Sequence, residues 1–168
     1  VLESVFPGLA RYFSPKPGAR AFIEWAQPRY RLVLATNPVW PREIIELRLK
    51  WAEIRPESFV FVSDASLMTA SKPHLEYYRE VLKHISATPE ECLLIGNDRK
   101  MDLPAADAGI PVFLVRDTQR LTSVVTRGAP AFRGSFEHLK KLLASGVLGL
   151  CLSLSSPARA QPRPSSGV

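Results

Sequence analysis

The stretch LLIGNDRKMDLPAADAGI, residues 93–110, joins an apolar run directly to a group of charged side chains. Its first residues are aliphatic, as in a β-strand buried inside a protein. Asn97, Asp98 and Asp102 follow at once, with two cationic residues between the acids. Ligands of α/β proteins gather at the carboxyl ends of the strands, so acids at this place predict a binding site. We expect other strands to bring further polar side chains to the same edge.

Three further apolar runs are similar to the one that opens this stretch. Each is short and rich in β-branched or aromatic residues, and none alternates cleanly between polar and apolar side chains. Strands of this composition are typical of a parallel sheet that is covered on both faces. The predicted strands are residues 31–36, 59–62, 92–95 and 111–115.

Helical patterns fill the gaps between these strands. Pro41 and Pro73 stand where a first helical residue is expected, because proline lacks the amide hydrogen that stays unpaired there, and Ser71 is a possible cap. Alternating strands and helices predict an α/β fold with a doubly wound, Rossmann-like parallel sheet. The predicted helices are residues 19–27, 41–53, 73–85, roughly 101–108, and 135–144.

The two ends of the chain depart from this pattern. Residues 1–17 mix an amphipathic start with prolines, and we interpret them as an entry helix and a linker. Residues 146–168 are rich in Ser, Pro and Gly and bury too little apolar surface to offset the entropy of ordering, so we expect a disordered tail. One core domain over residues 18–145 is the expected organisation. The first residue is valine rather than methionine, which favours a cut at this end.

Charge and composition argue against several classes of protein. The net charge is +6, but Lys and Arg are scattered among acids as on a solvated surface, so we expect no nucleic-acid partner. The apolar run at residues 147–154 is interrupted and much shorter than the about 20 residues that span a bilayer, so we expect no membrane partner. Cys92 and Cys151 lie far apart, which favours free thiols in the cytoplasm.

Polar side chains follow several of the predicted strands. Because the carboxyl ends of parallel strands meet at one edge of a sheet, these residues are expected to share one rim. The candidates are Thr36 and Asn37 after the first strand, Ser63 and Asp64 after the second, Lys72 one loop later, and Asn97, Asp98 and Asp102 after the third.

Asp98 and Asp102 have two possible roles on spacing alone. Mg²⁺ takes oxygen ligands, typically one or two carboxylates with water and substrate phosphate, and this pair could supply the carboxylates. An Asp after a strand also often caps the next helix, and a second acid in the first turns is then a favourable charge at the helix dipole. Both interpretations stay open at this point.

Lys72, Thr36 and Asn37 could bind a phosphoryl group. An ammonium neutralises phosphate or stabilises a nearby carboxylate, and a hydroxyl with adjacent amides can hold a phosphoryl oxygen. The alternatives are a solvated lysine and an ordinary strand end. His74 follows Lys72 closely and could touch a substrate, although a surface helix residue is the more frequent case.

The other histidines and the aromatic residues have simpler interpretations. His84 and His138 fall within amphipathic helices and are expected to face solvent or pack partway. The remaining residues are expected to pack apolar surfaces: Tyr77 and Tyr78 join a helix to the sheet, and Trp25, Trp40 and Trp51 belong to core packing.

Three segments follow one another in the order LVLATNP (32–38), SKPHLEYY (71–78) and LLIGNDRKMDLPAADAGIPVFLV (93–115). Together they resemble the haloacid dehalogenase (HAD) superfamily of hydrolases over roughly residues 18–116. The resemblance implies that Thr36 is the hydroxyl of the second family motif and Lys72 the lysine of the third. It also implies that Asp98 and Asp102 are the acids of the fourth motif, which help to position Mg²⁺.

The first motif of that family is absent from the sequence. In most members an aspartate of an Asp-x-Asp pattern, placed after the central strand, attacks phosphorus, and the second aspartate acts as general acid and base. This chain contains no Asp-x-Asp. The resemblance therefore implies a core without its central strand, which would lie between the strands that end in Thr36 and Ile95. Asn97 stands where many relatives carry Asp, so which of Asn97, Asp98 and Asp102 meets the metal stays open.

The resemblance implies a Mg²⁺-dependent phosphatase that acts on a small phosphorylated metabolite through an aspartyl-phosphate. The chain would be a fragment truncated at its N-terminus, with residues 1–17 as a remnant of the cap and linker, and inactive alone because it lacks the nucleophile. The alternative is a pseudoenzyme, or a phosphate-binding or protein-interaction module that pairs its exposed strand edges with a partner. A dehalogenase would need the same missing aspartate.

Overall fold

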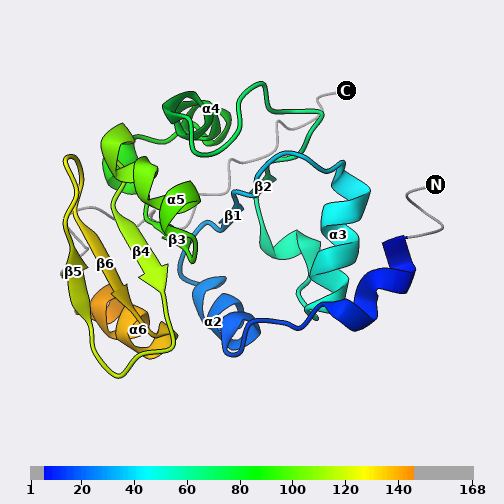
Figure 1. Cartoon of the computed structure of the whole chain (residues 1–168), viewed down its shortest axis with the longest axis horizontal. Coiled ribbons are helices and arrows are strands. Elements are labelled where there is room, and N and C mark those ends of the chain that lie inside the picture. Colours follow the sequence, from blue (N-terminus) through cyan, green and yellow to red (C-terminus); the bar gives the residue numbers. More distant parts are fainter. Residues whose placement is uncertain (1–5, 146–168) are drawn as a thin grey trace, which may run out of the picture.

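The computed structural model of the protein describes residues 6–145, and these residues form a mixed α/β fold (Figure 1). The tail predicted at residues 146–168, and Cys151 within it, lie outside the described residues. Cys92 is a free thiol, as expected. Among residues 6–145, none of the helices has the length and apolar composition needed to cross a membrane.

The strands form two separate sheets. In the first, β1 (Val33–Leu34) pairs in parallel with β2 (Phe61–Val62). The second has the order β3-β4-β6-β5, in which β3, β4 and β6 run parallel and β5 is antiparallel to β6. Its strands are β3 (Leu94–Gly96), β4 (Val112–Val115), β5 (Thr122–Val124) and β6 (Ala131–Gly134).

The helices follow the predicted pattern with shifted boundaries, except that most of the helix predicted at residues 101–108 is a 3₁₀ helix. They are α2 (Ala19–Ala26), α3 (Arg42–Trp51), α4 (Leu75–Ile85), α5 (Arg99–Asp102) and α6 (Phe136–Ala144). Short 3₁₀ helices are η1 (Phe6–Tyr12), η2 (Pro56–Ser58), η3 (Pro89–Glu91) and η4 (Leu103–Ala108). The entry helix predicted before residue 18 is therefore a 3₁₀ helix over its described part.

The start of α4 differs from the prediction. Pro73 is not the first helical residue, and Ser71 is not the cap, because the chain turns first: the amide of His74 donates to the carbonyl of Ser71 at 3.1 Å. The helix then begins at Leu75 with His74 at the N-cap position. Pro41 likewise occupies the N-cap position of α3 rather than its first turn.

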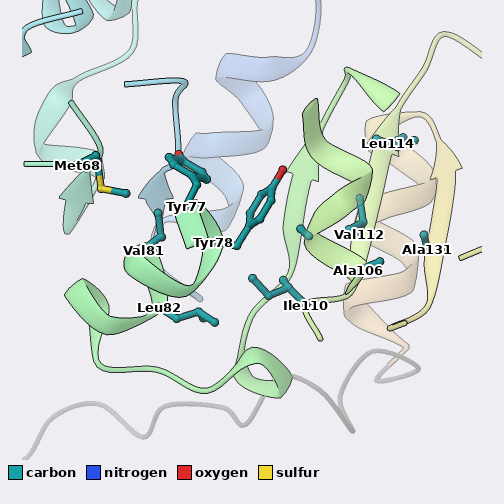
Figure 2. Packing of buried hydrophobic residues seen from close by; sticks show 11 residues of the cluster. Met68, Tyr77, Tyr78, Val81, Leu82, Ala106, Ile110, Val112, Leu114 and Ala131 are labelled. Atoms are coloured by element: carbon teal, nitrogen blue, oxygen red, sulfur yellow. The ribbon is translucent and has the colours of Figure 1, made fainter. Parts of the chain in front are cut away.

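The second sheet is packed on both faces of β4, as predicted from strands in which polar and apolar residues do not alternate. Along β4, Val112 and Leu114 belong to one apolar cluster, and Phe113 and Val115 belong to the other. Successive side chains of a strand point to opposite faces, so helices cover β4 from both sides. Figure 2 shows the first cluster, in which Tyr77 and Tyr78 come from α4. The second cluster contains Phe22 of α2 and Leu139 of α6.

A cavity of about 360 Å³ separates the two sheets, and residues of β1 and β3 line it. On one side, Leu34 turns its carbonyl to the second strand, where it accepts from the amide of Ser63 at 3.1 Å. Backbone groups alternate between the two sides of a strand, so those of Val33 and Ala35 face the cavity. We name this cavity the interstrand slot.

The other wall of the interstrand slot is β3. The amide of Leu94 donates to the carbonyl of Pro111 at 2.9 Å, on the β4 side, so the backbone groups of Leu93 and Ile95 face the slot. Ile95 is 38% exposed, although β4 beside it is buried throughout. Within residues 6–145 no strand lies between β1 and β3, which agrees with the predicted core that lacks its central strand.

Replacing Tyr77 by Phe should destabilise the fold. The hydroxyl of Tyr77 lies 3.0 Å from the Ser63 hydroxyl and donates to the Thr36 carbonyl at 2.5 Å, and Tyr77 is completely buried. Removing the buried hydroxyl and its hydrogen bonds should lower the free energy of unfolding by about 1 kcal/mol, because Ser63 and the Thr36 carbonyl keep the hydrogen bond between them. Urea unfolding measures this change in the free energy of unfolding. Tyr12→Phe is the control, since Tyr12 is 69% exposed. Equal effects of the two substitutions would contradict this role.

Candidate active site

Asp102 is the most enclosed of the predicted site residues. It lies at the end of α5 and is only 5% exposed. Its Oδ2 accepts hydrogen bonds at 2.9 Å from the amides of Asn97 and Asp98, and its Oδ1 accepts one at 2.7 Å from Nζ of Lys72. A buried carboxylate held by an ammonium and two amides is a fixed point of negative charge.

Lys72 connects two parts of the predicted rim. Its side chain is only 9% exposed and forms the ion pair with Asp102. Its backbone amide donates to Oδ1 of Asn37 at 3.2 Å, and its ammonium lies 5.7 Å from the centre of the Tyr77 ring. The loop after β1 and the loop after β3 therefore meet at this lysine, which excludes the alternative of a solvated side chain.

Thr36 is tied to the loop after β2. Its hydroxyl donates to the carbonyl of Ser63 at 2.9 Å, and its own carbonyl accepts from the Ser63 hydroxyl at 3.0 Å and from Tyr77. Burial raises the pKa of Tyr77 to about 12, so this phenol stays protonated and can donate at neutral pH. Tyr77 was predicted only as a packing residue, but a buried tyrosine needs a polar partner, and here it fixes the position of Thr36.

Asp98 caps α5. Its Oδ1 accepts from the amides of Lys100 at 2.7 Å and Met101 at 3.2 Å, and the residue is exposed. The capping interpretation is therefore present in the structure for Asp98, whereas Asp102 is in a buried ion pair. A cap that uses one oxygen is compatible with a metal on the other. Among the described residues there is no group of three or more His, Cys, Asp or Glu side chains placed to hold a metal ion.

This donor set fits Mg²⁺ better than a metal that needs a full protein cage. Mg²⁺ binds through one or two carboxylates and fills its other positions with water and substrate oxygens. Asp98 and Asp102 flank the same turn, because the amide of Asp98 donates to Asp102. They would hold the ion from one side and leave the remaining positions open to a phosphoryl group.

Gly96 was not among the predicted site residues, yet the site depends on it. A Cβ atom at this position would lie 2.2 Å from Oδ2 of Asp102 and 2.7 Å from its Cβ, far inside van der Waals contact. Only glycine leaves room for the carboxylate to reach the amides of Asn97 and Asp98. Glycine between an apolar strand and the acids is the sequence signal for such a close approach.

Asp64 and Ser63 lie on the rim as predicted but are occupied with local structure. Oδ1 of Asp64 accepts from the amide of Ser66 at 2.8 Å and from its hydroxyl at 2.6 Å. Burial alone would raise the pKa of Asp64, but these hydrogen bonds, with a further one from Leu67, outweigh it and lower that pKa. Asp64 is therefore an ionised turn residue. His74 is exposed, and its side chain makes no capping hydrogen bond.

The fold and the polar residues at the ends of its strands agree with one protein family. The family model of haloacid dehalogenase-like hydrolases matches residues 5–109, which is more than half of the chain. The chain therefore belongs to the haloacid dehalogenase-like hydrolases. Among curated proteins, none matches it with significance.

Solved structures of this superfamily share the fold. The HAD hydrolase YfnB of Bacillus subtilis, whose structure is bound to magnesium, is 22% identical with a TM-score of 0.62 and covers 76% of this chain. A HAD-superfamily hydrolase of subfamily IA from Geobacter sulfurreducens is 25% identical with a TM-score of 0.61 and covers 82% of this chain. A HAD phosphatase of Thermococcus onnurineus is 17% identical with a TM-score of 0.66 and covers 85% of this chain. This chain spans 55%, 65% and 64% of these three proteins, respectively.

The pair of Lys72 and Asp102 should be strongly coupled. Asp102→Asn removes one charge of a buried pair and should cost about 3–5 kcal/mol of unfolding free energy, because the ammonium is left uncompensated. The double variant Lys72→Met with Asp102→Asn should be more stable than Asp102→Asn alone, since the orphaned charge is gone. Chemical unfolding of the unmodified chain, of Lys72→Met, of Asp102→Asn and of the double variant measures the coupling between the two residues.

A surface ion pair is the control for this double-mutant cycle. Arg42 and Glu46 are joined at 2.7 Å, but their side chains are 38% and 42% exposed. Glu46→Gln should change the stability by no more than about 1 kcal/mol. Additive losses at Lys72 and Asp102, or a loss at Glu46 as large as that at Asp102, would refute the assignment of a buried, mutually dependent pair.

Proposed function

We propose that this chain carries the phosphoryl-binding half of a Mg²⁺-dependent phosphatase that acts on a small phosphorylated metabolite. The observation that carries the proposal is the buried pair of Lys72 and Asp102, joined through Asn37 to Thr36 on one side and through the backbone to Asp98 on the other. These contacts support one continuous rim, where a phosphoryl group would meet a cation, a hydroxyl, an amide and two carboxylates.

Each residue of the rim has a role that its contacts support. Asp98 and Asp102 would hold Mg²⁺, which offsets the charge of the phosphate oxygens during transfer. Lys72 would bind a phosphoryl oxygen, since its ammonium has three donors and Asp102 accounts for one contact. The Asn37 backbone amide would bind another oxygen, and the Thr36 hydroxyl would bind one by exchanging its hydrogen bond to the Ser63 carbonyl for one to the phosphoryl group.

The nucleophile would reach this rim along the interstrand slot. An extended apolar segment in the slot could pair with the free edges of β1 and β3, and its carboxyl end would emerge between Thr36 and Gly96. An aspartate placed there could attack phosphorus, breaking the bond to the leaving oxygen, and a second acid could protonate that oxygen; water would then release phosphate from the aspartyl-phosphate. No Asp-x-Asp exists in this chain, so we expect it to be inactive alone.

A second candidate function is a strand-binding module without turnover. The interstrand slot itself favours it, because two strand edges with unpaired backbone groups can accept a segment of another polypeptide. Such a module would keep the phosphate-binding rim as a ligand site or as a relic of an enzyme.

Adding a strand peptide separates these two functions. A peptide of roughly six apolar residues that ends in Asp-x-Asp should restore Mg²⁺-dependent hydrolysis of p-nitrophenyl phosphate, whereas the same peptide with Asn-x-Asn should bind without turnover. Liberated p-nitrophenol is the readout for turnover, and fluorescence anisotropy of the labelled peptide is the readout for binding. Binding of both peptides with hydrolysis by neither supports the module, and failure of both to bind argues against each function.

Asp98→Asn tests whether Asp98 is more than a cap. Asparagine caps a helix about as well as aspartate, so the stability should change little. Mg²⁺ binding in the presence of inorganic phosphate, followed by calorimetry, should weaken about tenfold or more, because one of two carboxylate ligands is lost. Unchanged Mg²⁺ affinity would leave Asp98 as a cap alone and shift the metal role to Asp102.

A further inference from the structure

A second hollow, of about 500 Å³, opens beside the candidate active site. It lies between the segment after η1, the end of β1 and α3, and we name it the aromatic cleft. Thr36 and Asn37 are among its lining residues, and both belong to the proposed phosphoryl-binding rim. Its size is within the range of about 300–1,000 Å³ that small-molecule sites occupy.

Contacts between aromatic rings support the wall of the aromatic cleft. Phe6 is 7% exposed; its ring stacks on Trp51 at 5.7 Å between centroids and meets the edge of Trp40 at 5.2 Å. The ring of Phe13 lies 5.3 Å from that of Trp51, between centroids. Figure 1 shows η1, which carries Phe6, lying beside α3, which carries Trp51. Trp40 and Trp51 were predicted only as packing residues, but they also line this cleft.

The charges of the aromatic cleft have one sign. Lys16 and Arg48 line it, and no Asp or Glu is found among the described residues that do so. Arg48 is exposed, and its guanidinium lies 5.8 Å from the centre of the Phe13 ring, where a cation over an aromatic face is stabilised. A ligand of this cleft should therefore combine a flat apolar body with negative charge.

We propose that the aromatic cleft binds the group that carries the phosphate, and that this group is an aromatic ring. The proposal rests on the proposed function, since it places the phosphoryl end of the same substrate at Thr36 and Asn37. A polyhydroxylated sugar fits the cleft less well, because each buried hydroxyl needs a polar partner, whereas indole and phenyl rings offer stacking surface. The substrate class is thus an aryl phosphate monoester rather than a sugar phosphate.

Two non-hydrolysable anions test this proposal without turnover. Phenylphosphonate carries a ring and methylphosphonate does not, and calorimetry with Mg²⁺ present measures the binding of each to the full chain. Ring stacking on aromatic side chains contributes about 1–3 kcal/mol, so phenylphosphonate should bind roughly tenfold more tightly or better. Equal affinities for the two anions would overturn the aromatic cleft as a ring site and leave the phosphoryl-binding rim intact.

Single substitutions test whether the preference for phenylphosphonate arises in the aromatic cleft. Phe13→Ser and Arg48→Ala change exposed positions of the aromatic cleft and should reduce the preference for phenylphosphonate over methylphosphonate about threefold or more. Arg11→Ala is the matched control, because Arg11 stacks on Tyr12 at 4.9 Å in the neighbouring η1. Loss of ring preference in the control, or none at Phe13 and Arg48, would contradict the assignment.

Lys72→Met distinguishes the two proposals. If it abolishes methylphosphonate binding and weakens phenylphosphonate, both the rim and the aromatic cleft are supported. If methylphosphonate binds to neither protein while phenylphosphonate binds to both alike, the aromatic cleft stands and the phosphoryl-binding role of Lys72 fails. If neither anion binds to the unmodified chain, both proposals fail.

Discussion

The buried pair of Lys72 and Asp102 is the interaction on which the candidate site depends. Taking both charges out of water is costly, and the pair persists because Asp102 also accepts two backbone amides. Gly96 makes this approach possible, since any larger residue would collide with the carboxylate. The ion pair joins the loop after β3 to the segment before α4, and the backbone amide of Lys72 joins that segment to Asn37 after β1.

Much of this arrangement could be predicted from the sequence. The apolar runs located β1 to β4, and the rule that ligands gather at strand ends predicted that Lys72 and Asp102 lie at one edge, where they form an ion pair. The pattern did not reveal β5 and β6, because polar residues such as Thr122 and Arg133 interrupt their apolar runs. Nor could spacing separate the cap at Asp98 from the buried acid at Asp102, since burial follows from tertiary contacts that the spacing does not encode.

The interstrand slot and the aromatic cleft differ in the chemical groups that line them. The interstrand slot presents strand edges and aliphatic side chains, suited to an extended polypeptide, whereas the aromatic cleft presents rings and two cations, suited to a small anion. Thr36 lies two residues after the end of β1 and lines the aromatic cleft. A nucleophile arriving through the slot and a substrate lying in the cleft would thus meet at the same rim.

The most direct measurement is a crystal structure of the chain with Mn²⁺ in place of Mg²⁺ and with tungstate in place of phosphate, both located by anomalous scattering. We expect Mn²⁺ in direct contact with a carboxylate oxygen of Asp98 or Asp102, and tungstate within hydrogen-bond distance of Lys72 Nζ and the Thr36 hydroxyl. Metal and anion sites that lie elsewhere on the described surface, with the pair of Lys72 and Asp102 undisturbed, would contradict the account.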